Sequence, residues 1–162
     1  MSTENQRSDE VCCPEFNPVA WNEVTHSWKE KMFIRDKVST IFYMPLNFST
    51  VMVRLNKAME GAGATSPDWL CLSDHRSKWS MELHLAVDKE ITGAQNVRLS
   101  GEFFSKVYEG PFKDSGKWAK DFDQFARNRG LNLVKKFFWY TTCPKCAKKY
   151  GKNYVVIIGQ LG

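Results

Sequence analysis

The chain has 162 residues, of which 43% are hydrophobic and 14% aromatic, so it can bury the core of one domain and lacks the composition of a disordered protein. No apolar run approaches the roughly 18 residues of a membrane span, and residues 1–10 are polar, which excludes a secretory signal. We therefore expect a cytoplasmic protein with no membrane partner, in which residues 1–10 form a disordered tail.

The net charge of +5 is unevenly distributed. Residues 113–153 hold 11 Lys and Arg residues against 3 Asp and Glu residues, a net charge of +8. A basic segment suits either a solvated surface or an acidic partner such as nucleic acid. We favour the solvated surface and do not expect nucleic acid as the partner.

Residues 11–35 precede the first recognisable strand, and we predict that they form an N-terminal arm. Trp21, Val24 and Trp28 are spaced as on one face of a helix. The spacing favours a helical or irregular arm that packs on a sheet. The alternative is a lid that adds an aromatic wall to a groove.

The first predicted unit spans residues 36–92. A β-prone segment, 37–44, ends at Pro45, which cannot supply a ladder donor. A helix follows, with its apolar stripe at Phe48, Met52, Leu55 and Met59 and its end at Gly61 and Gly63. Two more predicted strands cover residues 69–73 and 81–87.

The second predicted unit, residues 96–161, repeats this order. A strand over 97–107 stops at Gly110-Pro111, and strands over 134–142 and 154–161 complete the unit. The helix between them carries an apolar stripe of Trp118, Phe122, Phe125 and Ala126. The sequence thus predicts an α+β fold of duplicated βαββ units related by a pseudo-twofold axis. We expect an antiparallel sheet with both helices on one side and a ligand groove at the junction of the units.

A short motif connects the second unit to a known family. Tyr108-Glu109-Gly110-Pro111-Phe112, placed between a strand and an amphipathic helix, resembles the GyrI-like family, also called the bacterial effector-binding domain. The resemblance covers residues 36–161 and implies the duplicated βαββ fold. Regulators of this family carry a DNA-binding domain, for which residues 1–35 leave no room. We therefore expect a stand-alone domain that acts as a monomer or homodimer.

Two further segments resemble a hydrolase branch of the family. They are Cys12-Cys13-Pro14, followed by Trp21 and Trp28, and the run from Tyr140 to Gly151. The resemblance implies a groove for a hydrophobic or cationic small molecule. It also implies an activity similar to that of cyclopropanoid cyclopropyl hydrolases, which open strained rings of DNA-alkylating compounds.

The candidate catalytic residues are Glu82 and Tyr154. Strand alternation puts Glu82 and His84 on one face, where a carboxylate and an imidazole can perform acid–base chemistry. The alternative is an ordinary solvated face. GyrI-like grooves commonly hold a glutamate that faces aromatic residues, and the order of elements puts Glu82 opposite Tyr154. In this hypothesis Glu82 activates water and a tyrosine hydroxyl polarises the leaving oxygen.

Aromatic side chains are predicted to form the ligand-binding wall, although most buried aromatics are ordinary core residues. A carboxylate beside such rings suits a cationic or flat polycyclic ligand. Adjacent strand residues face opposite ways, so Trp139 and Tyr140 cannot both line the groove. The candidates are Tyr43, Trp79, Tyr108, Trp139, Tyr140 and Tyr154, with His84 beside them.

The chain has five cysteines, and four of them form two close pairs. Cys143 and Cys146 form a C-x-x-C turn that could bind a structural zinc ion together with Cys12 and Cys13. His26, His75 or Cys71 could replace one of the N-terminal ligands. Free thiols and a catalytic redox pair are the alternatives, and catalysis is expected to need no cofactor.

These observations leave two main functions open. The first is a GyrI-like hydrolase or detoxifying binder of a hydrophobic electrophile. The second is a non-catalytic module that sequesters a drug or contacts another protein.

Overall fold

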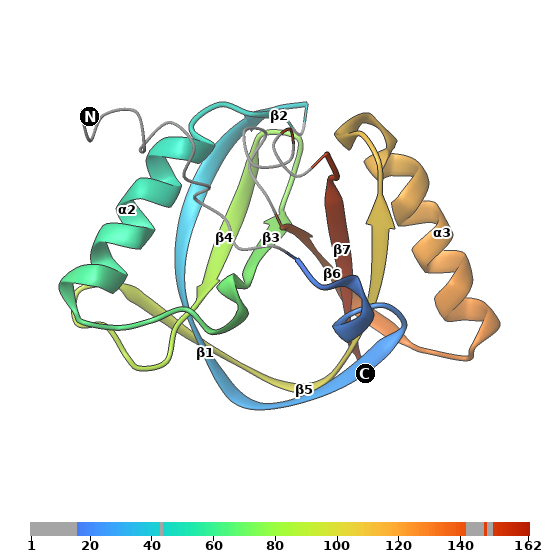
Figure 1. Cartoon of the computed structure of the whole chain (residues 1–162), viewed down its shortest axis with the longest axis horizontal. Coiled ribbons are helices and arrows are strands. Elements are labelled where there is room, and N and C mark those ends of the chain that lie inside the picture. Colours follow the sequence, from blue (N-terminus) through green and yellow to red (C-terminus); the bar gives the residue numbers. More distant parts are fainter. Residues whose placement is uncertain (1–15, 43, 142–147, 149–150) are drawn as a thin grey trace, which may run out of the picture.

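The computed structural model describes residues 16–42, 44–141, 148 and 151–162, and these residues form an α+β fold (Figure 1). The order of elements β-α-β-β occurs twice, as the sequence predicts. The first set is β1 (Val24–Ile41), α2 (Phe48–Gly61), β3 (Cys71–His75) and β4 (Ser80–Ala86). The second set is β5 (Gln95–Glu109), α3 (Ser115–Asn128), β6 (Leu133–Tyr140) and β7 (Tyr154–Leu161). A two-residue strand, β2 (Met44–Pro45), follows β1.

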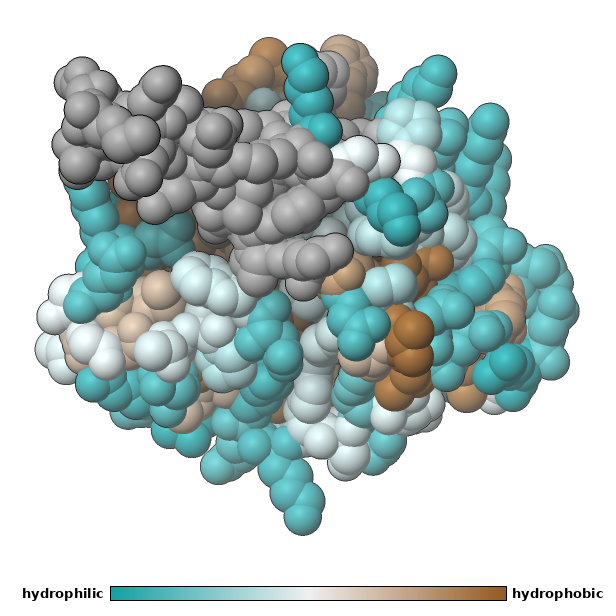
Figure 2. Space-filling model, viewed as in Figure 1, coloured by the Kyte–Doolittle hydropathy of each residue, from teal (hydrophilic) through white to brown (hydrophobic). Residues whose placement is uncertain are grey.

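The strands form one antiparallel sheet that closes on itself. Its order is β2-β1-β4-β3-β6-β7-β5, and an additional pairing of β1 with β5 joins the two ends into a ring of six strands. We expected an antiparallel sheet with both helices on one side. In the closed sheet, α2 and α3 cover the outer surface at opposite flanks (Figure 1). The outward surface of α3 is mainly hydrophilic (Figure 2).

The predicted helical arm is wrong, because Val24 to Ile41 form one continuous strand. The predicted boundary at residue 36 therefore falls inside β1. A β-bulge between Trp28 and Lys31, where Glu30 has φ 48°, changes which residues face inward. The helix-like spacing has another origin: Trp21 ends a short 3-10 helix, Pro18–Ala20, before the strand, and Val24 and Trp28 lie four residues apart on one face of β1.

Both helices pack through the apolar stripes that their spacing predicts. Val51, Leu55 and Met59 of α2 are buried, and Phe48 and Met52 are partly buried against the same cluster. The α2 stripe packs on Met81, Leu83 and Leu85 of β4. On the other flank, Phe122 of α3 packs on Phe104 and Ile157, with Trp118 and Phe125 at the edge.

A third core fills the inside of the closed sheet. It includes Trp21 and, from all six strands, Phe33, Leu72, Ala86, Phe103, Phe137, Trp139, Val156 and Ile158. Each strand therefore separates an outer, helix-covered core from an inner one. This arrangement explains why the strands are apolar on both faces and why their alternation is weak in the sequence.

Gly159 of β7 lies close to Phe122 of α3 and Leu133 of β6. A Cβ atom there would lie 2.5 Å from Leu133 Cδ2 and 3.0 Å from Phe122 Cε1. Because Phe122 is fully buried and cannot withdraw, we expect Gly159→Ala to lower the free energy of unfolding by about 1–3 kcal/mol in urea denaturation.

Gly116→Ala is the matched control, because its Cβ would meet nothing within 4 Å and the residue lies in α3. It should stabilise the protein by up to about 1 kcal/mol through helix propensity. Equal effects of the two substitutions would contradict this packing.

Candidate functional site

Glu82 and His84 share the inner face of β4, as strand alternation predicts. Met81, Leu83 and Leu85 face α2 on the outside. Ala86 lies two residues after His84 and therefore points to the same face of the strand as Glu82 and His84. Ala86 belongs to the inner core. The two polar residues therefore project toward the interior of the closed sheet rather than into solvent outside it.

Glu82 lies in a cluster of charged side chains. Its Oε2 atom is 3.3 Å from Arg76 Nη2 and 3.9 Å from Arg35 Nη1. Asp74 of β3 is buried, with its Oδ2 atom 3.2 Å from Arg76 Nε and 2.7 Å from Lys135 Nζ. Each of the two carboxylates thus has two cationic neighbours, which hold the carboxylates in fixed positions.

A cavity of about 240 Å³ opens beside Glu82. It is lined by Arg35, Asp36, Lys37, Glu82 and Gln95. Lys37 on β1 is the cross-strand partner of Glu82, and Arg35 donates through Nε and Nη2 to Gln95 Oε1 at 3.2 and 3.1 Å. The side chain of Glu82 is 19% exposed, so water or a small group can reach its carboxylate.

His84 lies deeper, at 5% exposure, between the ring edges of Phe33 and Phe137. Burial lowers the pKa of His84 to about 4 and outweighs the opposing influence of the Asp74 and Glu82 carboxylates. Its Nδ1 atom is buried with no hydrogen-bond partner among the described residues. At neutral pH the imidazole is therefore uncharged.

Tyr154 and Trp139 belong to the second half of the sheet. Trp139 faces inward, but at 4% exposure it is a core residue, packed edge-on against Phe16 at 5.3 Å and Trp21 at 4.9 Å. The Tyr154 ring lies 5.5 Å from Phe16. The described partners of Glu82 are guanidinium groups, so the predicted pairing of Glu82 with Tyr154 is not observed among these contacts.

Two predicted ligand-binding aromatics face the outer surface instead of the interior. Tyr108 stacks on Trp118 at 5.7 Å and donates its hydroxyl hydrogen to Asp121 Oδ2 at 2.7 Å, on the α3 side. Tyr140 stacks on Phe138 and lies 3.3 Å from His75 Nε2, and burial raises its pKa to about 12. Each immediately follows an inward-facing residue, and this alternation fixes the opposite direction.

Trp79 is also placed differently from the prediction. It lies at the turn between β3 and β4, is 57% exposed and packs on Phe42 at 5.2 Å. The ion-pair partners of Glu82 in the described part of the chain are Arg35 and Arg76, and an aromatic cage around this carboxylate is not observed there. Tyr43 lies outside the described residues.

The four cysteines predicted to bind zinc, Cys12, Cys13, Cys143 and Cys146, lie outside the described residues. In the described part of the chain, no group of three His, Cys, Asp or Glu residues could hold a metal ion. Cys71 packs against Met52, and burial raises the pKa of its thiol to about 12. Zinc binding and the absence of a catalytic cofactor thus stay predictions from the sequence.

The residues that the sequence prediction missed are the basic ones around Glu82. Arg35 and Lys37 lie two residues apart on β1, so their side chains point to the same face. The sequence prediction places Arg35 in the N-terminal arm, where the direction of its side chain cannot be inferred. Asp74 and Arg76 fall between the two predicted strands, 69–73 and 81–87, where the sequence predicts no side-chain direction. Alternation along residues 72–76 was the signal that could have placed Asp74 on the same face as Leu72.

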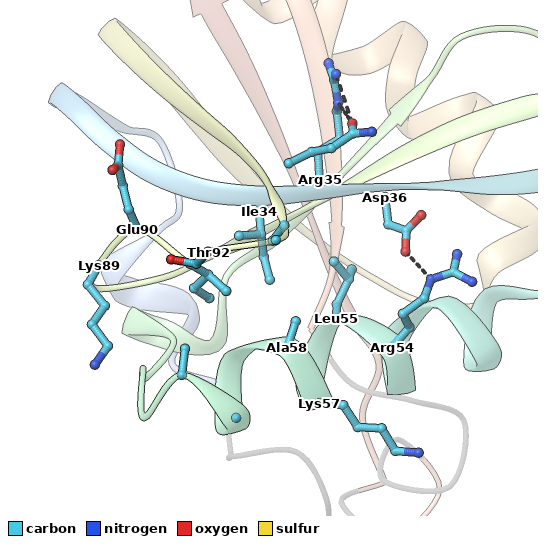
Figure 3. A pocket seen from close by; sticks show the side chains of 16 residues that line it. Ile34, Arg35, Asp36, Arg54, Leu55, Lys57, Ala58, Lys89, Glu90 and Thr92 are labelled. Carbon is cyan, nitrogen blue, oxygen red and sulfur yellow. Dashed lines mark hydrogen bonds and ion pairs between the residues drawn. The ribbon is translucent and has the colours of Figure 1, made fainter.

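A larger cavity of about 720 Å³ lies between α2, β1 and the segment that joins β4 to β5. Figure 3 shows Ile34, Leu55 and Ala58 turned into it, while Lys57 points away from it. Arg54 pairs with Asp36 at its edge. Arg35 projects from the opposite side of β1 (Figure 3), and its Nη1 atom lies 3.9 Å from Glu82 Oε2. The two cavities share Arg35, Asp36 and Gln95 in their linings, whereas Lys37 and Glu82 line the smaller cavity and not the larger one.

Solved structures of other proteins share this fold. The C-terminal domain of EcmrR matches with a TM-score of 0.66 and 11% identity over 88% of this chain and 98% of that chain. A hydrolase from Listeria innocua matches with a TM-score of 0.62 and 14% identity over 98% and 97%. SAV2435 bound to tetraphenylphosphonium matches with a TM-score of 0.51 and 12% identity over 87% and 94%. At such identities the likeness concerns the fold alone, which fits the GyrI-like effector-binding class.

The sequence also matches a family directly. The model of the bacterial hydrolase family covers residues 3–161, and the chain belongs to this family. None of the curated proteins matches the sequence. Among the described residues, neither helix has the length and apolar character needed to cross a membrane.

The buried, neutral His84 makes stability depend on pH. An unfolded histidine, with a pKa near 6.5, takes up a proton as the pH falls, whereas folded His84 resists protonation down to about 4. The free energy of unfolding should therefore decrease below about pH 6.5. We expect this decrease between pH 7.5 and 5.5 to be about 1 kcal/mol smaller in His84→Gln, measured by urea denaturation at both pH values.

His26 and His75 also have pKa values lowered by burial, so they contribute to the pH dependence of both proteins. The comparison with the His84→Gln variant isolates His84. An identical decrease in the two proteins would show that His84 is not held neutral.

Proposed function

We propose that this member of the bacterial hydrolase family binds a hydrophobic, electrophilic small molecule at the Glu82 cavity and hydrolyses it. The observation that carries the proposal is the position of Glu82, a partly exposed carboxylate that lines a 240 Å³ cavity and is held by two arginines. A fixed carboxylate that is accessible to water can act as a general base. The family match supports hydrolysis as the reaction class.

In the proposed reaction, Glu82 accepts a proton from water as the water oxygen attacks the electrophilic carbon. The bond to the leaving atom breaks, and the charge that develops there needs a nearby donor. Arg35 lines the cavity, and Arg76 shares Glu82, so both are within reach of a group bound there. Tyr154 is retained as the second candidate, a hydroxyl that would polarise the leaving oxygen of a ligand extending along the inner face.

Ring opening of a cyclopropane-containing alkylating compound is the specific reaction we propose within this class. The resemblance of the sequence to cyclopropyl hydrolases is its source, and detoxification would be its result. A strained ring is opened by one water molecule, with no other reactant, which agrees with a site built from a carboxylate and donors.

A second candidate function is non-catalytic sequestering of a drug-like ligand. SAV2435, which shares the fold, is solved with tetraphenylphosphonium bound. The double pairing of Glu82 with arginines also favours this alternative, since those ion pairs compete with water for the carboxylate.

Nucleic-acid binding by the basic segment is a weaker candidate. Several of its cations have acidic partners, including Lys117 with Asp114, Lys136 with Asp123 and Arg129 with Glu23. These pairs reduce the charge that phosphates could meet.

The decisive test is turnover by Glu82→Gln. Wild-type protein is incubated with cyclopropane-containing aromatic electrophiles and aryl esters, and the products are identified by mass spectrometry. Loss of the general base should lower turnover at least about 100-fold, while the melting temperature stays close to that of the wild type because the substitution preserves side-chain shape.

Glu102→Gln is the matched control, because Glu102 is exposed on β5 next to an inward-facing residue and so lies on the outer face. It should leave turnover unchanged. Binding without any product in wild-type protein would support the sequestering function, and full activity of Glu82→Gln would eliminate Glu82 as the base.

A further inference from the structure

The charges around the Glu82 cavity are unbalanced. Four cationic side chains, Arg35, Lys37, Arg76 and Lys135, surround the carboxylates of Asp74 and Glu82. Asp36 also lines the cavity, but its carboxylate is paired with Arg54, so these two residues together add no net charge. His84 is neutral because burial lowers its pKa to about 4. Among the described residues, the side chains around the cavity therefore carry a net charge of +2 at neutral pH.

Lys37 supplies the part of the excess positive charge that a ligand in the cavity can reach. It lines the cavity and lies directly across from Glu82 on β1. It has no ion-pair partner among the described residues, whereas Arg76 and Lys135 are engaged with Asp74. A bound group would therefore meet the ammonium group of Lys37 without displacing an existing ion pair.

Arg35 supplies a second set of hydrogen-bond donors that could turn to a bound ligand. Two of its nitrogens donate to the neutral carbonyl of Gln95, which is exposed, and the third lies 3.9 Å from Glu82. A guanidinium group bonds a carboxylate more strongly than a neutral amide, because both partners are then charged. An anionic ligand could replace Gln95 as the acceptor.

The same field acts against cations. A cationic ligand at Glu82 would approach two guanidinium groups and an ammonium group, and recessed sites between protein walls concentrate such fields. We propose that the Glu82 cavity selects a ligand with an anionic group, a carboxylate in the simplest case, joined to a hydrophobic body. This inference rests on the proposed function for the location of the site, and it names the ligand class that the site accepts.

The size of the cavity suits the anionic group of such a ligand rather than its hydrophobic body. A volume of about 240 Å³ is below the roughly 300–1,000 Å³ of pockets that enclose a drug-sized molecule. It accommodates the polar end of a ligand, while the apolar body lies outside the charged cluster.

The test compares three ligands that share one aromatic body. Binding of 2-naphthoate, 2-naphthamide and 2-naphthylmethylammonium is measured by calorimetry at low salt. We expect naphthoate to bind about tenfold or more tightly than the amide, and the ammonium compound to bind most weakly. Salt should weaken naphthoate binding, as screening requires. Equal binding of all three, preference for the cation, or binding of none would overturn the inference.

Substitutions then locate the anion. Lys37→Met should remove the preference for naphthoate over the amide, whereas Lys120→Met, which makes the same charge change on the exposed surface of α3, should preserve it. Lys89→Met tests the larger cavity, which Lys89 lines from the segment between β4 and β5. Loss of the preference in Lys89→Met but not in Lys37→Met would place the anion in that cavity and overturn the inference.

These measurements report binding and not turnover, so they separate the two proposals. Selective naphthoate binding together with full activity of Glu82→Gln would keep the ligand class and reject the catalytic role. Turnover that requires Glu82, without any preference for the anion, would do the reverse.

Discussion

The pairing of β1 with two different strands is the constraint on which the architecture depends. Residues 33–39 of β1 pair with β4, and residues 24–35 pair with β5, so the two strands are held by one 18-residue segment. This double pairing joins the two ends of the sheet and leaves β2 as its short extension. A closed sheet has no long exposed edges, which protects it from pairing with other chains. The bulge near Glu30 supplies the local bend that such a long strand needs.

Closure gives the sheet two very different surfaces. The outer surface receives the two helices through apolar side chains, and the inner surface holds both aromatic residues and the charged cluster around Glu82. Taking charges out of water is costly, and one carboxylate alone on the inner surface would destabilise the fold. Asp74 and Glu82 share Arg76, and Lys135 and Arg35 complete the pairs, so the cluster offsets much of that cost within itself. The same desolvation keeps His84 uncharged between Phe33 and Phe137.

The GyrI-like fold does not by itself determine which ligand is bound, because ligand choice depends on the side chains of the site. SAV2435 has this fold and is solved with a cationic compound, tetraphenylphosphonium. In the present protein the carboxylate in the cavity is already neutralised by arginines, and Lys37 adds a positive charge that has no ion-pair partner in the described part of the chain. One backbone arrangement can thus serve ligands of opposite charge when cations from neighbouring strands surround the inward-facing carboxylate.

Local patterns in the sequence determined the elements whose information is contained within a few residues. The stripes of α2 and α3, the strand from Tyr154 to Leu161 and the shared face of Glu82 and His84 all follow from spacing. Tertiary structure alone decided the closure of the sheet, because the pairing of β1 with β5 joins residues about 60 to 80 positions apart. Tertiary structure also decided which face of the sheet each aromatic side chain occupies, since the strand preference of Tyr108 and Tyr140 is the same for either face. The charged groups around Glu82 could not be inferred from local sequence either. The cations come from β1, β6 and the segment after β3, and only the folded sheet brings them to the carboxylates of Glu82 and Asp74.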